Sequence, residues 1–343
     1  MNKFITKQGS RLAALAAGVV LFSFTANAQD LVNSKKINNV AGGVIKFNDD
    51  AGKFTNNNAN TAQITNAGTI QMMGTNNSFD GTTPLATATA RVPGLVSYAD
   101  DAVGNQNIFP GYYTDLDMAD VATKQFGAGS IFIGGNYTTA DGDRVYGTST
   151  VTYDGGTATT GAATQAIAAE NATNGGGYNN LDFTEDGLKT LSVGSALVNG
   201  TTGIDASTTG GGLVVDGTSG ATLTATGDLT QDAGAGDFSL NAGGVVNVNG
   251  PTNGVGANLV VNNGTLNLGD GANASATTVT GSLDLTGATG LLAANASSTL
   301  NVDGGFTNTD ATRTNMTFDG TSLVDYLDNA TAVMTTAQTK PYG

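Results

Sequence analysis

The amino-acid sequence predicts an all-β protein, folded as a right-handed parallel β-solenoid (β-helix) with irregular insertions and a short C-terminal capping helix. Three observations support this fold class. Glycine accounts for 50 of the 343 residues, about twice the usual share. Many short segments alternate apolar and polar residues, a pattern typical of strands with one buried face. Similar segments recur along the chain, separated by the glycine, asparagine and aspartate that favour turns.

The first 28 residues are predicted to be a secretory signal peptide. Three basic residues precede an apolar run over 12–24, and a small-x-small cleavage site follows at 26–28. The apolar run has 13 residues, whereas a membrane-spanning helix needs about 20. We therefore expect residues 1–28 to be removed, no transmembrane segment, and export of the remaining chain to the outer cell surface or the extracellular space.

The composition excludes several function classes. The chain has no histidine, cysteine or tryptophan, so it has no histidine- or cysteine-based catalytic system, no thiolate or imidazole metal site and no disulfide. The net charge is −15, and it becomes 10 − 28 = −18 once the leader and its three cations are removed. Nucleic acid is not expected as a partner, because neutralising phosphates requires clustered cations.

Residues 29–90 are expected to form a β-rich N-terminal cap with the first coils, and residues 91–210 to form aromatic-containing β repeats. The second region contains two copies of one gap-free pattern, which we call the long repeat, at a constant offset of 178 − 113 = 65 positions. The pairs at this offset are Tyr113/Tyr178, Leu116/Leu181, Lys124/Lys189 and Gly135/Gly200. A related preceding unit occurs as 96–98 with Gln106 and as 151–153 with Gln165. Within this region, residues 99–126 are expected to be an irregular insertion or a short helix.

Residues 211–320 are predicted to form regular solenoid coils. Successive strands are anchored by apolar residues at intervals of 20, 17, 17 and 18 positions: Val246, Leu266, Leu283, Leu300 and Phe318. A β-sandwich would also produce alternation, but its antiparallel strands turn after about 8–12 residues. A spacing near 18 favours parallel coils, in which equivalent strands recur once per coil.

Residues 321–343 are expected to form a C-terminal cap and tail. Ser322 precedes apolar residues at helical spacing: Leu323, Leu327, Ala330 and Met334. This pattern predicts a short helix that covers the last coil, since the ends of a solenoid need caps.

Several motifs resemble those of secreted β-helical surface repeat proteins of the Bacteroidota and Chlorobi type, which are adhesin- or autotransporter-like. The matching segments are Gly135-Asn136-Tyr137-Thr138, Val151-Thr152-Tyr153-Asp154-Gly155, Gln165, Tyr178-Asn179-Asn180-Leu181 and Gly187-Leu188-Lys189-Thr190-Leu191. The resemblance covers roughly residues 90–320. It implies cell-surface display, adhesion or a matrix layer. The C-terminal sorting domain or barrel of longer members is not expected here, which favours lateral or end-to-end assembly.

Calcium is the ion that the residue types favour most, because only oxygen ligands are available. The densest acidic clusters give the candidate ligands Asp115, Asp117, Asp120, Asp141 and Asp143. Solvated turn residues are the competing interpretation of these aspartates. No other cofactor is expected.

Taken together, these features predict a non-enzymatic structural protein of the cell surface or extracellular matrix. We expect it to associate with copies of itself into a filament, sheath or layer. One alternative is an adhesin that recognises glycans or another surface partner, for which the aromatic residues between 98 and 183 are candidates. A further alternative is a polysaccharide-degrading β-helix enzyme that uses aspartates.

Overall fold

The structure is a computed structural model. It describes residues 11–13, 20–22, 26–28, 30–33, 37–48, 51–56, 64–80, 91–99, 105–118, 123–139, 144–155, 164–171, 173, 176–184, 187–205, 212–270, 272–286, 291–295, 297–309, 315–318 and 321–326. The chain divides into two compact units, Met1–Ser149 and Thr150–Gly343. This boundary separates the two copies of the long repeat, so each copy belongs to its own unit.

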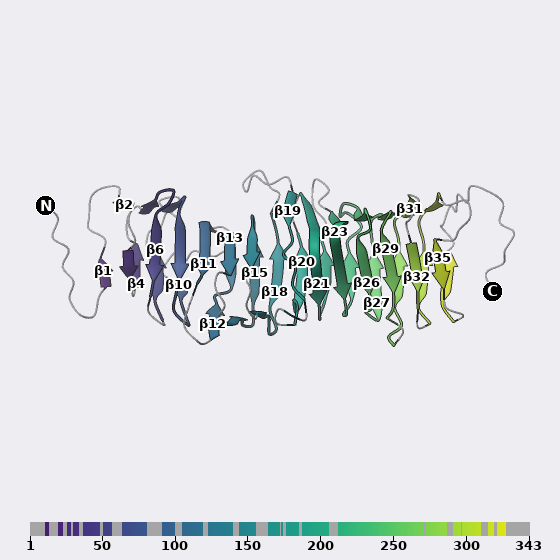
Figure 1. The fold of residues 1–343 in the computed structure, drawn as a ribbon, viewed down its shortest axis with the longest axis horizontal. Coiled ribbons are helices and arrows are strands. Elements are labelled where there is room, and N and C mark those ends of the chain that lie inside the picture. The colour runs from purple at the N-terminus through teal and green to yellow at the C-terminus, as the bar shows by residue number, and fades with distance from the viewer. Residues whose placement is uncertain are drawn as a thin grey trace. The chain divides into compact units, whose positions relative to one another are not determined.

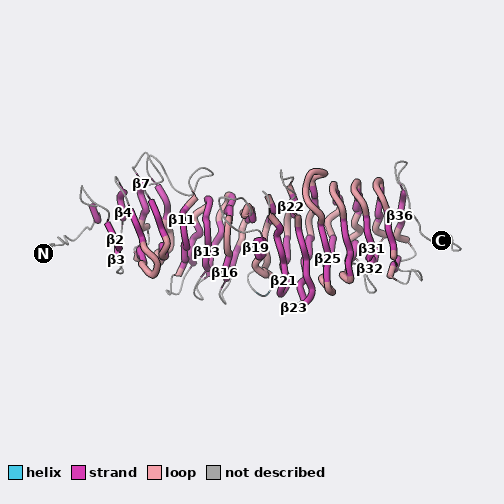
Figure 2. Tube along the Cα trace, turned by 90° about the horizontal axis from the view of Figure 1, so that it is seen from above, coloured by secondary structure: helices cyan, strands magenta, loops and turns pink. Residues whose placement is uncertain are grey.

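The fold is a parallel β-solenoid, which confirms the predicted fold class. Strands pair in parallel with their counterparts in neighbouring coils, as Figure 1 shows for the series β26, β29, β32 and β35. Figure 2 shows strands and loops, and none of the described residues belongs to an α-helix.

Unit 1 has its strands in four parallel groups. The first contains β1 (Arg11–Ala13), β4 (Asp30–Asn33), β7 (Lys53–Asn56) and β10 (Ser78–Asp80). The second contains β2 (Val20–Phe22), β5 (Ile37–Asn39) and β8 (Ile64–Asn66). The third contains β3 (Ala26–Ala28), β6 (Val44–Phe47), β9 (Thr69–Met72), β11 (Val92–Tyr98), β13 (Gly111–Met118) and β15 (Ser130–Ile133), with β16 (Tyr137–Thr139) also paired to β13. The fourth contains β12 (Asn105–Ile108), β14 (Thr123–Phe126) and β17 (Arg144–Val145).

Unit 2 has three sheet faces. One consists of β18 (Thr150–Tyr153), β20 (Asn180–Phe183), β22 (Thr202–Ile204), β24 (Leu229–Gln231), β27 (Thr252–Val255), β30 (Ala276–Val279), β33 (Thr299–Val302) and β36 (Leu323–Tyr326). The other two faces begin together in β19 (Thr164–Ala166), β21 (Leu188–Val198) and the long β23 (Leu213–Ala225). They then separate into β25 (Phe238–Asn241), β28 (Leu259–Asn262), β31 (Leu283–Thr286) and β34 (Phe306–Asn308), and into β26 (Val245–Val248), β29 (Thr265–Leu268), β32 (Leu291–Ala294) and β35 (Met316–Phe318).

The core of unit 2 is made of apolar columns that run from coil to coil. Val246, Leu266 and Leu292 are register partners on successive strands, and each side chain is 0–1% exposed. Because each buried aliphatic side chain contributes about 1.5–3 kcal/mol, such columns supply much of the stability. The residues between them face outward, which explains the period of two in the sequence.

The predicted spacing near 18 does not correspond to one coil. Leu266 stacks on Val246 at a separation of 266 − 246 = 20 positions, but its partner in the next coil is Leu292, at 292 − 266 = 26 positions. Leu283 lies on a different face, where it stacks on Leu259. The sequence interpretation mixed these faces because all three present the same apolar alternation to the core. Three strands and their turns make each coil longer than the predicted spacing.

Two helix predictions are wrong. Residues 105–108, 111–118 and 123–126, within the segment expected to be irregular or helical, are the strands β12, β13 and β14. The proposed helix from Ser322 is replaced by β36, whose backbone pairs with β33 instead of hydrogen-bonding within its own segment. Val324 faces the core from the position that Leu300 has on β33, so an alternating pattern fits this segment as well as a helical one. The other predicted helix positions, beginning at Leu327, lie outside the described residues.

Candidate functional site

The long repeat builds the same corner in both units. In unit 1, the Asn136 backbone N–H donates a hydrogen bond to Asp115 Oδ1 across 2.7 Å. In unit 2, the Thr201 backbone N–H donates to Asn180 Oδ1 across 2.9 Å. The residue before each donor is a glycine, Gly135 in unit 1 and Gly200 in unit 2.

Gly135 and Gly200 fill positions without room for a side chain. A Cβ at Gly135 would lie 2.9 Å from Thr114 O and would overlap the Asp115 carboxylate. A Cβ at Gly200 would lie 2.7 Å from Asn179 O and would overlap the Asn180 carboxamide. The repeated glycine therefore allows the chain to approach the corner of the preceding coil closely.

A pair of buried tyrosines holds one peptide unit in each copy. In unit 1, the hydroxyls of Tyr98 and Tyr113 lie 3.2 Å apart. Phe109 N donates to Tyr98 Oη, and Phe109 O accepts from Tyr113 Oη. Burial raises the pKa of Tyr98 to about 12, and burial together with Tyr98 raises the pKa of Tyr113 well above its ordinary value.

The second copy repeats this arrangement around Ala168. The hydroxyls of Tyr153 and Tyr178 lie 2.9 Å apart. Ala168 N donates to Tyr153 Oη across 3.0 Å, and Tyr178 Oη donates to Ala168 O across 2.9 Å. Burial raises the pKa of Tyr153 too. These four phenols are buried and hydrogen-bonded to backbone groups, so they hold the loops at Phe109 and Ala168 in place. Because their pKa values are raised or their hydroxyls are buried, they stay neutral and unreactive at neutral pH.

The repeated glutamine and lysine are also buried. Gln106 Nε2 donates to Met72 O and Gly74 O across 2.8 and 3.1 Å. Lys189 Nζ donates to Gly155 O and Gly187 O across 2.6 and 3.1 Å, and Gln165 Oε1 accepts from Gly155 N. Lys124 and Lys189 are each 1% exposed. These side chains lie inside the coils and are closed to an external substrate.

The candidate calcium ligands are only partly covered by the structure. Asp115 accepts the corner hydrogen bond described above. Asp117 Oδ2 accepts from Ser97 Oγ at 2.9 Å, and Asp117 Oδ1 accepts from Thr138 Oγ1 at 2.6 Å. The remaining candidates, Asp120, Asp141 and Asp143, lie outside the described residues. Among the residues that are described, no three acidic side chains gather as a metal site would require.

One aromatic pair faces outward from unit 1. Tyr112 on β13 and Phe132 on β15 stack with ring centroids 3.9 Å apart and an angle of 2° between their planes. The Arg91 guanidinium lies 5.5 Å from the centre of the Tyr112 ring and donates to Tyr113 O. Both rings are half-buried. Tyr112 and Phe132 have the outward placement that contact with a ligand would need, whereas the tyrosine pairs at 98/113 and 153/178 are interior.

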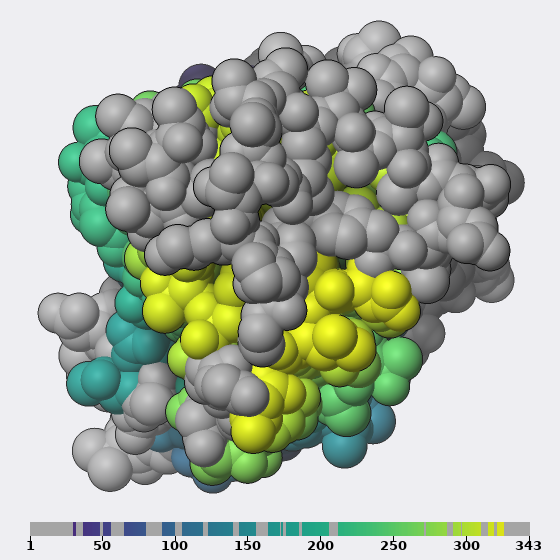
Figure 3. Space-filling view, turned by 90° about the vertical axis from the view of Figure 1, so that its right-hand side faces the viewer, coloured from purple at the N-terminus to yellow at the C-terminus, as the bar shows by residue number. Residues whose placement is uncertain are grey.

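We use the name terminal coil for β34, β35 and β36 of unit 2. Among the described residues, each of these strands pairs only with its predecessor, respectively β31, β32 and β33. Figure 3 looks onto this end, where the last described residues are yellow. The terminal coil therefore presents three parallel strand edges that no further described strand covers.

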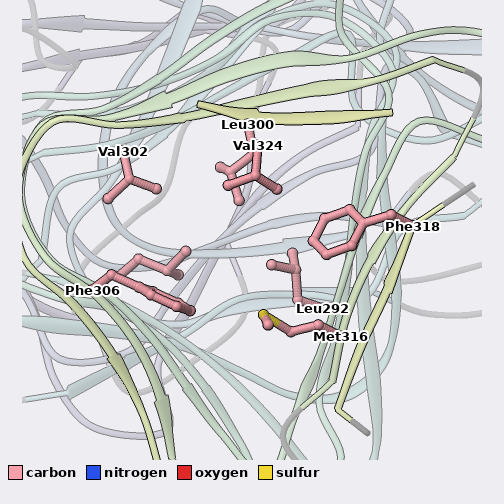
Figure 4. A pocket seen from close by; sticks show the side chains of 8 residues that line it. Leu292, Leu300, Val302, Phe306, Met316, Phe318 and Val324 are labelled. Atoms are coloured by element: carbon pink, nitrogen blue, oxygen red, sulfur yellow. The ribbon is translucent and has the colours of Figure 1, made fainter. Parts of the chain in front are cut away.

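An apolar pocket lies inside the terminal coil. Leucine and valine side chains of the preceding coil and four side chains of the terminal coil point toward one another there (Figure 4). The lining residues are Leu283, Leu292, Leu300, Val302, Phe306, Met316, Phe318 and Val324. Met316, Phe318 and Val324 are half-buried, whereas their partners Leu292, Ala294 and Leu300 in the preceding coil are at most 1% exposed. Apolar coverage thus decreases at this end.

No family model, curated protein or solved structure matches the chain. The comparisons therefore add nothing to the family resemblance. Within the described ranges there is no helix that is long and apolar enough to span a membrane.

The sequence pointed to some of these features and not to others. The constant offset of the long repeat identified Gly135, Gly200 and the two lysines, because each has a counterpart in the other copy. The aromatic pair at 112 and 132 was not singled out, since only the coil register makes these residues neighbours. The terminal coil was missed because Leu323 was assigned to a helix.

Proposed function

We propose that this protein is an exported, non-enzymatic structural component of the cell surface or extracellular matrix. In this proposal its copies associate through the terminal coil into a filament, sheath or layer. The observation that carries the proposal is the combination, at that coil, of strand edges that no further described strand covers and of half-buried apolar side chains. The resemblance to secreted β-helical surface repeat proteins extends the proposal to display on the cell surface.

Edge strands supply the chemical basis for association. Leu323 N donates to Ser298 O, next to β33. Because successive backbone groups of a strand point to opposite sides, the N–H and C=O of Val324 point to the open edge. A strand from a second copy that paired there would satisfy these groups and cover the half-buried apolar side chains.

Net charge sets the conditions for assembly. At −15 for the whole chain, and −18 without the first 28 residues, copies repel one another at low ionic strength. Salt at 0.5 M or added calcium would screen this repulsion, since the screening length falls below about 10 Å above 0.1 M salt. Assembly is therefore expected to increase with ionic strength.

Sedimentation and negative-stain electron microscopy test the proposal. Protein lacking residues 1–28 and the unprocessed chain are compared over a range of concentrations, in low salt, in 0.5 M NaCl and with calcium or EDTA. We expect ordered assemblies in high salt. The variant Val324→Pro removes the donor at the open edge but keeps the Leu323 hydrogen bond to Ser298, so it should need at least tenfold more protein to assemble.

A matched control is Val193→Lys in β21, because Val193 is 54% exposed and lies away from the terminal coil. This variant should assemble like the wild type. A wild-type protein that stayed monomeric in all of these conditions would refute the proposal, as would assembly that Val324→Pro leaves unchanged.

A further inference from the structure

A polar groove lies on unit 2 along the face formed by β26, β29 and β32. It is open to solvent and has a volume of about 560 Å³, within the range of ligand-binding clefts. Its lining consists of four asparagines, one aspartate and one glycine: Asn247, Asn249, Asn267, Asn295, Asp270 and Gly269. Carboxamide groups therefore dominate its surface.

The groove lies where one coil has a glycine and the coils on either side of it have an asparagine. Asn249, Gly269 and Asn295 directly follow β26, β29 and β32. Gly269 N donates to Val248 O, and Asn295 N donates to Leu268 O, so the three residues occupy the same position in successive coils. Since neighbouring strands lie about 4.8 Å apart, the two flanking asparagines are roughly 10 Å apart, with the glycine between them.

Gly269 cannot be replaced by a larger residue without moving the backbone. Its φ of +76° is unfavourable for residues with a side chain. A Cβ there would also lie 2.7 Å from Asn273 O and from Asn295 O. The position between Asn249 and Asn295 therefore requires glycine, and it adds no side chain to the groove.

The floor of the groove is ordered by hydrogen bonds between coils. Asn267 Nδ2 donates to Asn247 Oδ1 across 2.8 Å, and Asn247 Nδ2 donates to Thr224 Oγ1 across 2.9 Å. This ladder holds the two carboxamides in fixed orientations. In contrast, Asn249 Oδ1 is buried and accepts no hydrogen bond from the described protein groups. A buried acceptor in this state costs about 1–3 kcal/mol. If the Asn249 carboxamide turned toward the groove, a ligand hydroxyl could donate to this oxygen and offset that cost.

We propose that this groove binds a neutral saccharide, with adjacent hydroxyl groups on the asparagine carboxamides. A carboxamide presents a donor and an acceptor side by side, which complements neighbouring hydroxyls that each donate and accept. The lining includes no lysine or arginine, so an anionic saccharide would find no counter-charge. A single carboxylate is too few for a calcium site.

Asp270 shapes the rim of the groove and adds negative charge. Its carboxylate accepts from the backbone of Ala272 and Asn273 and from Asn273 Nδ2. These hydrogen bonds lower the pKa of Asp270. The carboxylate therefore stays ionised at neutral pH and disfavours anionic ligands further.

The groove belongs to a single copy of the chain, so this inference is independent of self-association. Calorimetric titration of the full-length chain in low salt tests it, with neutral hexasaccharides of glucose, mannose and galactose and with hexagalacturonate as the anionic probe. We expect at least one neutral hexasaccharide to bind, and to bind at least tenfold more tightly than hexagalacturonate.

Two variants assign any binding to the groove. Asn249→Leu removes a lining carboxamide and keeps the backbone hydrogen bond from Asn249 N to Ala225 O, so the coil should stay folded. It is expected to weaken binding at least tenfold. The control Asn301→Leu changes a half-buried outward asparagine on β33, outside the groove, and should alter binding less than twofold.

Three results would overturn the inference: no binding of any neutral hexasaccharide at 10 mM, equal or tighter binding of hexagalacturonate, or unchanged binding in Asn249→Leu. Circular dichroism and thermal unfolding of both variants establish that they fold. Sedimentation of the same samples, before and after adding saccharide, measures self-association separately. A failure to bind saccharide can therefore be distinguished from a failure to self-associate.

Discussion

The two copies of the long repeat, one in each unit, share their corners and tyrosine pairs but differ beside one carboxylate. In unit 1, Asp117 lies between Ser97 and Thr138 in the ladder and accepts hydrogen bonds from both hydroxyls. In unit 2, the equivalent Asp182 lies between Thr152 and Gly203. The glycine at 203 replaces the threonine hydroxyl that supports the carboxylate in the first copy.

The neighbouring charge differs as well. Burial and the nearby Asp205 raise the pKa of Asp182, and burial and Asp232 raise the pKa of Asp205. Unit 2 therefore carries a column of carboxylates that disfavour one another's ionisation. The glycines, the tyrosine pairs and the corner acceptors therefore hold the backbone of the repeat in the same way in both copies. The outward ladder position differs, with Thr138 in unit 1 and Gly203 in unit 2.

Replacing the corner glycines should have the largest effect. Gly135→Ala and Gly200→Ala each place a Cβ against a backbone oxygen, so each should lower the free energy of unfolding by about 2–3 kcal/mol. Urea unfolding, with hydrogen exchange resolved by peptide, measures the loss in each unit. Gly127→Ala and Gly254→Ala are matched controls, since nothing lies within 4 Å of a Cβ at either position. A cost in one copy no larger than that of its control would show that the corners are not equivalent.

Removing one hydroxyl from each tyrosine pair comes next. Tyr113→Phe and Tyr178→Phe leave a backbone oxygen, of Phe109 and Ala168 respectively, without its hydroxyl donor. Each should cost about 1–3 kcal/mol. Thermal unfolding of both variants provides the comparison. Tyr112→Phe keeps the stacked ring of a half-buried residue and should change stability by less than about 0.5 kcal/mol. Similar costs for all three would contradict the structural role of the pairs.

The corner acceptors should contribute less, because these hydrogen bonds are exposed to solvent. Asp115→Ala and Asn180→Ala each remove the acceptor for one backbone N–H and should cost about 1 kcal/mol. Asp115→Asn retains an acceptor oxygen and should be nearly neutral. Urea unfolding distinguishes these variants. A loss for Asp115→Asn as large as that for Asp115→Ala would mean that the charge, and not the hydrogen bond, matters at this corner.

The smallest effect concerns pH. Because the pKa of Asp182 is raised above its ordinary value of 3.8, the folded state binds this proton more tightly than the unfolded state. Its contribution to stability is therefore favourable at low pH and is lost as the pH rises from about 3.8 through the raised pKa. Asp182→Asn should slightly stabilise unit 2 at pH 7 and have no such benefit at pH 3. Urea unfolding at the two pH values measures the difference, and an equal effect at both would contradict the raised pKa.

Introducing at position 203 the threonine hydroxyl that unit 1 has at Thr138 tests why the two carboxylates differ. A Cβ at Gly203 would lie 2.6 Å from Asp182 Oδ1, too close for a real contact, so in Gly203→Thr the Asp182 carboxylate must rotate away from the Cβ. The threonine hydroxyl would then lie beside this carboxylate. The added hydrogen bond should lower the pKa of Asp182 toward its ordinary value. Carbon-detected NMR titration of the side-chain carboxyl measures the change. An unchanged or higher pKa would mean that the Gly203 position does not explain the difference between the copies.

The sequence was sufficient to predict strands, parallel coils and the repeated unit. The alternation of apolar and polar residues, and the constant offset between the two copies of the long repeat, can both be recognised in the sequence without knowledge of the fold. The number of strands per coil was not predictable in this way, because Leu266 and Leu283 look alike although they lie on different faces. Only the register shows that Leu266 stacks on Val246 and Leu283 on Leu259.

The functional surfaces were harder to predict for the same reason. Asn249 and Asn295 are 295 − 249 = 46 positions apart in the sequence, and only the coil register shows that they lie on either side of Gly269. The segment from Ser322 has apolar spacing compatible with a helix, but the backbone of β33 offers it a strand partner. In both cases, contacts between coils determine the structure, and these contacts cannot be read from the local sequence.

Association through the terminal coil is tested most directly by spin labels at two exposed positions. The chain has no cysteine, so Leu323→Cys and Val193→Cys each give a single labelling site, and the native side chains are 55% and 54% exposed. We predict that raising the protein concentration in 0.5 M NaCl immobilises the label at 323 and leaves the label at 193 mobile. Growing assemblies in which the label at 323 keeps its mobility would contradict association through this coil.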